Sequence, residues 1–99
     1  MKQTFGQWLQ LKRAELNLTK YRLAKDLNCS NTYIRTMEID KYTPSKDFAI
    51  RIADYFEDDR DYVLSLIGMV SDDVLQIILD NPVSVCHFIR KLKKNTGNR

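Results

Sequence analysis

Few side chains in this sequence could carry out catalytic or metal chemistry. His87 is the only histidine, and the two cysteines, Cys29 and Cys86, lie far apart in the chain. Nucleophilic catalysis needs a nucleophile, a base and a group that orients the base, and a structural zinc site needs four Cys or His ligands. The three glycines form no phosphate-binding loop. The sequence therefore predicts a protein that is not an enzyme and that binds no metal or cofactor.

Charged residues, in contrast, are distributed unevenly along the chain. Residues 1–45 contain eight basic and four acidic side chains, residues 46–81 contain three and nine, and residues 82–99 contain five and none. The two basic segments could contact a polyanion, which the acidic middle would repel. A patchy, solvated surface would have the same distribution. Charge alone leaves both interpretations open.

Length and composition are those of an ordinary small globular protein. The chain has 99 residues, of which 43% are hydrophobic and 29% charged. It contains neither a signal-peptide leader nor an apolar run near the ~18 residues of a membrane span. Two widely separated cysteines are typical of reduced thiols. We therefore expect a cytoplasmic protein that does not associate with membranes.

The spacing of apolar residues predicts an all-α fold. No segment alternates with the two-residue period of a strand, and helical spacing recurs between capping residues. The expected helices cover residues 5–17, 20–27, 31–39, 46–56 and 60–67, a segment that begins after Ser71, and residues 82–94. Gly68 would end the fifth helix, and Asn81 followed by Pro82 would open the seventh. In the first helix, Phe5, Leu9 and Leu16 would share one apolar face.

Two of the expected helices, 20–27 and 31–39, are joined by a very tight connection. Only Asn28 and Cys29 separate the first of them from Ser30, the cap of the second. So sharp a turn usually needs a positive φ, which asparagine adopts more readily than other non-glycine residues. Ala24 is small enough for the two helices to approach closely. This is the pattern of a helix-turn-helix, whose second helix is free to enter a major groove.

Two charged residues lie on faces that otherwise pack inward. Arg13 follows Leu9 by four residues on the first helix, and Glu38 follows Ile34 by four on the third. A buried charge is costly unless it has a partner. We therefore expect Arg13 and Glu38 to form one partly buried ion pair with a structural role.

The stretch LTKYRLAKDLNCSNTYIRTMEIDKYTPS resembles the helix-turn-helix domain of phage-type repressors, the Cro/C1 or XRE family. The matching positions are Leu18-Thr19, Leu23-Ala24, Leu27, Ser30, Ile34, Glu38, Pro44-Ser45 and Leu66-Ile67-Gly68. The resemblance implies a lambda-repressor-like domain of five helices over residues 1–68, followed by two additional helices in residues 69–99. It also implies the Arg13–Glu38 pair. Asn28 and Asp40 stand where the family often has glycine, and both tolerate a left-handed backbone.

The resemblance further implies that the helix over residues 31–39 reads DNA bases through Asn31, Thr32 and Thr36. Asparagine can pair with adenine, and threonine can bond to a base or contact the thymine methyl group. Tyr33 and Arg35 would flank these contacts at the sugar-phosphate backbone or an outer base. The expected phosphate contacts are Thr19, Lys20, Lys41 and Tyr42. Lys20 replaces the usual glutamine and would keep only its phosphate role.

These observations predict a transcriptional regulator that binds double-stranded DNA, most simply a repressor with a palindromic operator. Two alternatives stay open: a DNA-binding antitoxin that also neutralises a toxin, and a protein-interaction adaptor on the same fold. The small polar residues on the helix over 31–39 favour DNA over an adaptor. We expect a homodimer formed through Val85, Phe88, Ile89 and Leu92, although folding back or another protein partner would also cover these side chains.

Overall fold

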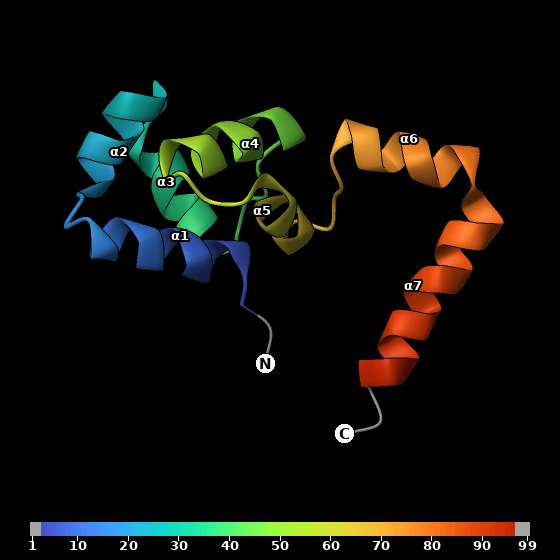
Figure 1. Cartoon of the computed structure of the whole chain (residues 1–99). Helices are drawn as coiled ribbons and strands as arrows, with labels where there is room; N and C mark the ends of the chain where they lie inside the picture. Colours follow the sequence, from blue (N-terminus) through green and yellow to red (C-terminus); the bar gives the residue numbers. More distant parts are fainter. Residues whose placement is uncertain (1–2, 97–99) are drawn as a thin grey trace. The chain divides into compact units, whose positions relative to one another are not determined.

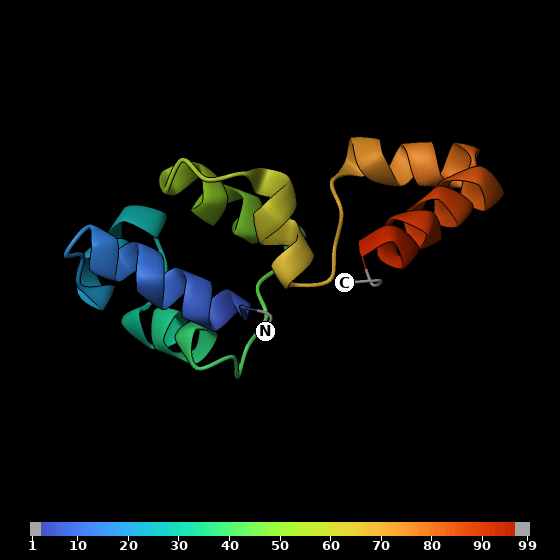
Figure 2. The same cartoon turned by 60° about the horizontal axis from the view of Figure 1, so that its bottom comes forward.

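The computed structural model describes residues 3–96, and these residues form α-helices without any strand (Figures 1 and 2). The helices are α1 (Phe5–Glu15), α2 (Lys20–Leu27), α3 (Asn31–Glu38), α4 (Lys46–Tyr55), α5 (Arg60–Leu66), α6 (Asp72–Asp80) and α7 (Pro82–Thr96). The all-helical fold predicted from apolar spacing is confirmed. None of the described helices is both long and apolar enough to cross a membrane.

Polar side chains begin the helices because the first backbone N–H groups of a helix have no acceptor within it. The Thr4 hydroxyl accepts from the Gln7 N–H, and the Gln7 side chain accepts from the Thr4 N–H, which completes a capping box. One side chain accepts in the same manner at the start of each of the next four helices: Thr19, Ser30, Ser45 and Asp59. Ser71 occupies the cap position of α6, but its hydroxyl donates to the Asp73 carboxylate instead.

Each of the first five helices ends beside a residue with positive φ. These residues are Asn17, Asn28, Asp40, Glu57 and Gly68. The left-handed turn at Asn17 ends α1 at Glu15, two residues earlier than the sequence predicts. Leu16 is consequently the cap residue with 59% of its surface exposed, and the expectation that it shares the buried face of α1 is wrong.

The chain forms two compact units, the first ending at Met69 and the second beginning at Val70. In the first unit, α1 to α5 surround one apolar core. Its buried members are Phe5, Trp8, Leu9, Leu23, Ala24, Leu27, Ile34, Met37, Ala49, Ile52, Ala53, Val63 and Leu64. Because every one of the five helices contributes to this core, the inner face of α3 is held from several sides.

The second unit consists of α6 and α7. Asn81 ends α6, its side-chain amide donating to the Ile77 carbonyl at 3.2 Å. Pro82, which has no N–H to leave unpaired, begins α7 directly afterwards. Helix α7 reaches Thr96, two residues beyond the expected end. Among the described residues of this unit no side chain is fully buried, so the unit has no core of its own.

Candidate nucleic-acid interface

The turn between α2 and α3 is built by backbone geometry and capping. Asn28 has φ 59°, as its position in the sequence predicts, and the Cys29 N–H donates to the Ala24 carbonyl at 2.9 Å. From α4, the Arg51 guanidinium donates to the Leu27 carbonyl at 2.8 Å. This bond satisfies one of the last carbonyls of α2, which have no partner within the helix. No local pattern in the sequence marked Arg51 for this role.

Helix α3 has one buried face and one exposed face. Ile34 and Met37 are completely buried, whereas Asn31, Thr32 and Arg35 are exposed. The exposed side chains are those for which the sequence predicts contacts with DNA. Thr36 is half-buried, and its hydroxyl donates to the Tyr33 carbonyl at 2.9 Å. In this conformation Thr36 offers its methyl group and an acceptor oxygen to a ligand.

Tyr33 points into an aromatic cluster. Its ring centroid lies 5.0 Å from that of Tyr42 and 5.4 Å from that of Phe48, and the Arg51 guanidinium lies 5.2 Å from the centre of the Phe48 ring. Burial and a hydrogen bond with Tyr42 raise the pKa of Tyr33 to about 12. The Tyr33 ring thus packs within the domain, whereas Tyr42 is 50% exposed.

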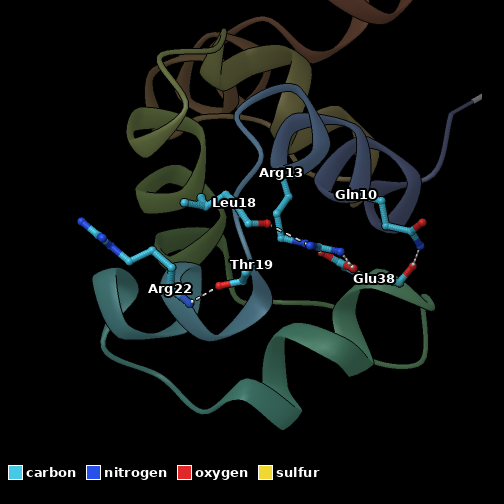
Figure 3. A network of polar contacts seen from close by, with 6 residues as sticks. All are labelled: Gln10, Arg13, Leu18, Thr19, Arg22 and Glu38. Carbon is cyan, nitrogen blue, oxygen red and sulfur yellow. Dashed lines mark hydrogen bonds and ion pairs between the residues drawn. The ribbon is translucent and has the colours of Figure 1, made fainter.

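Arg13 connects α1 to both ends of the helix-turn-helix (Figure 3). Its Nε donates to Glu38 Oε2 at 2.7 Å and its Nη2 to Glu38 Oε1 at 3.0 Å, while Nη1 donates to the Leu18 carbonyl at 2.9 Å. The hydrogen bond with Glu38 raises the pKa of Arg13. Glu38 is only 4% exposed. Because Leu18 precedes the cap of α2 and Glu38 ends α3, a single guanidinium holds the two helices in register.

A second connection joins the end of α3 to the start of α1. Asp40 accepts from the Gly6 N–H at 2.8 Å and from the Thr4 hydroxyl at 2.7 Å. A Cβ on Gly6 would collide with the Glu38 carbonyl oxygen, so only glycine allows this approach. Sequence reasoning identified Asp40 as a left-handed position and missed Gly6. The position of Gly6 inside a helical pattern could have indicated this role, since a glycine there often marks the close approach of another backbone segment.

Comparison with known proteins adds to this geometry. Residues 9–60, more than half of the chain, match a family model described as Helix-turn-helix. The chain belongs to the Cro/C1-type helix-turn-helix family. This family, also called XRE, consists of DNA-binding regulators rather than enzymes. No curated protein and no solved structure matches the chain.

In this helix-turn-helix protein the expected phosphate contacts lie at the ends of α2 and α3. Thr19 and Lys20 begin α2, where the unpaired N–H groups and the helix dipole favour an anion. Lys41 and Tyr42 lie in the loop after α3, with two residues between its end at Glu38 and Lys41, and both of their N–H groups donate to the Thr36 carbonyl. Thr19 and Lys41 are exposed, and Lys20 is half-buried.

Proposed function

We propose that this helix-turn-helix protein is a transcriptional repressor that binds a palindromic operator as a homodimer. The observation that carries the proposal is the division of α3 into a buried and an exposed face. Ile34 and Met37 anchor the helix in the core, while Asn31, Thr32 and Arg35 project small polar or cationic groups outward. Such side chains can form hydrogen bonds with base edges in a major groove.

The contacts divide into two kinds in this proposal. Asn31, Thr32 and Thr36 read bases from the first turns of α3, and Arg35 reaches an outer base or the backbone. Thr19, Lys20, Lys41 and Tyr42 hold phosphates on either side and set the register without reading sequence. The Tyr33 ring packs against the Tyr42 ring in a tilted arrangement, with the ring centroids 5.0 Å apart, and so supports Tyr42. We therefore assign Tyr33 to positioning rather than to direct DNA contact.

A homodimer follows from the small size of one binding surface. A single recognition helix reads only a short half-site, whereas two helices related by a two-fold axis read two half-sites about 34 Å apart. The exposed apolar side chains of α7 support this assignment: Phe88, Ile89 and Leu92 have 61%, 50% and 50% of their surfaces exposed. Val85, the fourth residue expected at the interface, is half-buried.

Selection of bound duplexes from a random DNA pool tests the proposal. We expect an enriched sequence with two inverted half-sites whose centres lie about 10 base pairs apart. A reporter whose promoter overlaps that sequence should then lose expression when the protein is present and recover it with Asn31→Ala. If no sequence is enriched, the protein does not read an operator; if expression rises, it is an activator and not a repressor.

A further inference from the structure

The second unit, formed by α6 and α7, exposes many apolar side chains. In this unit seven large hydrophobic residues between α6 and the end of the described side chains are more than one third exposed: Leu75, Ile77, Leu79, Val83, Phe88, Ile89 and Leu92. None of the described side chains in the unit is fully buried. Two helices without a core cannot be stable in isolation, and an apolar surface of this kind marks an interaction site.

The arrangement of the two helices shows where cover is missing. α6 and α7 diverge from the Asn81–Pro82 junction in both views (Figures 1 and 2). Ile78 on α6 and Val85 and Cys86 on α7 are half-buried near this junction, and Val74 is half-buried further along α6. Helix α7 has 15 residues and α6 has nine, and the exposed Phe88, Ile89 and Leu92 lie in the distal part of α7. The distal part of α7 therefore retains an exposed apolar surface.

The charges of the two helices are opposite in sign. Helix α6 contains three acidic residues and no basic one, and α7 contains basic residues and no acidic one. The charged side chains of the two helices that the structure describes are those of Asp72, Asp73, Asp80, Arg90, Lys91 and Lys93. Lys91 follows Phe88 by three residues and Lys93 follows Ile89 by four, so basic side chains flank the apolar stripe of α7 on both sides.

We propose that two copies of the chain join with exchanged pairing, in which each α6 packs against the α7 of the other copy. This inference rests on the proposed homodimer and adds which helices meet. The four helices then form a bundle in which like helices lie on the diagonals and neighbouring helices have opposite charge. The alternative, α7 against α7 and α6 against α6, would place like charges side by side, which disfavours the contact.

Charge reversal of each helix in the full-length chain tests the pairing. One variant reverses α6 (Asp72→Lys with Asp80→Lys), and the other reverses α7 (Lys91→Glu with Lys93→Glu). The dimer dissociation constant is measured by sedimentation without DNA at about 50 mM salt, where charge screening is weak. Glu15→Lys with Asp61→Lys is the matched control, because it changes the net charge as the α6 variant does but at exposed positions of the first unit.

The expected result has three parts. Each reversed variant alone should dimerise about tenfold or more weakly than the parent chain, because every exchanged contact then joins like charges. An equimolar mixture of the two should recover parent affinity as a heterodimer, since each exchanged contact between the two chains again joins opposite charges. The control should match the parent chain. Fluorescence of Trp8, the only tryptophan and a core residue of the first unit, verifies that this unit stays folded.

Recovery in the mixture is the decisive observation. Attraction between α6 and α7 within one chain would be lost in each variant and could not be restored by mixing. Reversed variants that dimerise as well as the parent indicate pairing of like helices, and a parent chain that stays monomeric at about 100 µM excludes a stable dimer of standard interface size. Each of these outcomes overturns the inference. Operator binding is measured separately, so a failure to bind DNA leaves this result unaffected.

Discussion

Arg13 and Glu38 are joined by two parallel hydrogen bonds, from Nε to Oε2 at 2.7 Å and from Nη2 to Oε1 at 3.0 Å. The pair bridges α1 and α3, and the third guanidinium nitrogen holds the Leu18 carbonyl before α2. Two opposite charges expected from their positions on apolar faces thus meet in the folded chain. Because Glu38 is almost wholly buried, the loss of either partner leaves a charge or a polar group without compensation.

Glu38→Gln should therefore destabilise the fold by about 2–3 kcal/mol, below the range for a completely buried pair because the Arg13 side chain is 22% exposed. Glu15→Gln is the matched control, since the Glu15 side chain is 55% exposed and its change should cost less than about 0.5 kcal/mol. Chemical denaturation measures both values. Equal midpoints for the two variants would show that the pair does not contribute to stability.

Gly6 and Gly68 should respond differently to alanine. A Cβ at Gly6 would meet the carbonyl group of Glu38, the last residue of α3, and Asp40 Oδ1 at 2.8 Å. Gly6→Ala should thus cost about 2–3 kcal/mol through displacement of α1 from α3. At Gly68, with φ 72°, a Cβ meets nothing within 4 Å, so Gly68→Ala should cost only the left-handed strain of about 1 kcal/mol. A smaller melting-temperature loss at Gly6 than at Gly68 would contradict this account.

Asn31→Ala and Lys41→Ala should weaken DNA binding in different ways. We expect Asn31→Ala to cost about 1–3 kcal/mol on the selected operator and to relax base preference at one position of each half-site. Lys41→Ala should weaken operator and random DNA alike and reduce the salt slope by about one unit per binding surface. Titrations at several salt concentrations on both duplexes separate the two effects. If both variants keep the ratio of the affinity for the operator to the affinity for random DNA unchanged, the assignment of separate base-reading and phosphate-binding residues is wrong.

Asp58 should make stability depend on pH in the acidic range. The Trp8 indole donates to Asp58 at 2.8 Å, and this bond, the Asp59 N–H and the Lys12 ammonium lower the pKa of Asp58. Because the unfolded pKa is about 4, the ionised group stabilises the fold above that pH, and its contribution disappears as the pH falls through the lower folded value.

Asp58→Asn should accordingly lower the free energy of unfolding at neutral pH and reduce its decline below about pH 4. Denaturant titrations followed by circular dichroism between about pH 2 and pH 7 cover the range in which the carboxyl titrates. Asp61→Asn, at an exposed position on α5, is the control. If the free energy of unfolding depends on pH in the same way in the parent chain and in Asp58→Asn, the ionisation of Asp58 is not coupled to folding through its contact with Trp8.

The sequence by itself determined that the chain is helical, the side-chain caps of α1 to α5, and the family. Thr19, Ser30 and the left-handed Asn28 act through bonds to residues at most a few positions away. Such short-range signals can be recognised in the sequence without knowledge of the fold. They predict the bounds of the two helices of the helix-turn-helix to within one residue. The inward face of α3 could also be predicted, because Ile34 and Met37 have the spacing that places two residues on one side of a helix.

Only the tertiary structure decided which distant groups support these helices. Arg51 reaches the Leu27 carbonyl, Tyr33 packs on Phe48 and Gly6 admits the Glu38 carbonyl because α1, α3 and α4 meet at particular distances and orientations. These distances and orientations depend on how whole helices pack, and no local spacing in the sequence encodes them. Tyr33 illustrates the difference: its place on α3 predicts a contact with DNA, but the position of α4 gives its ring an aromatic partner inside the domain.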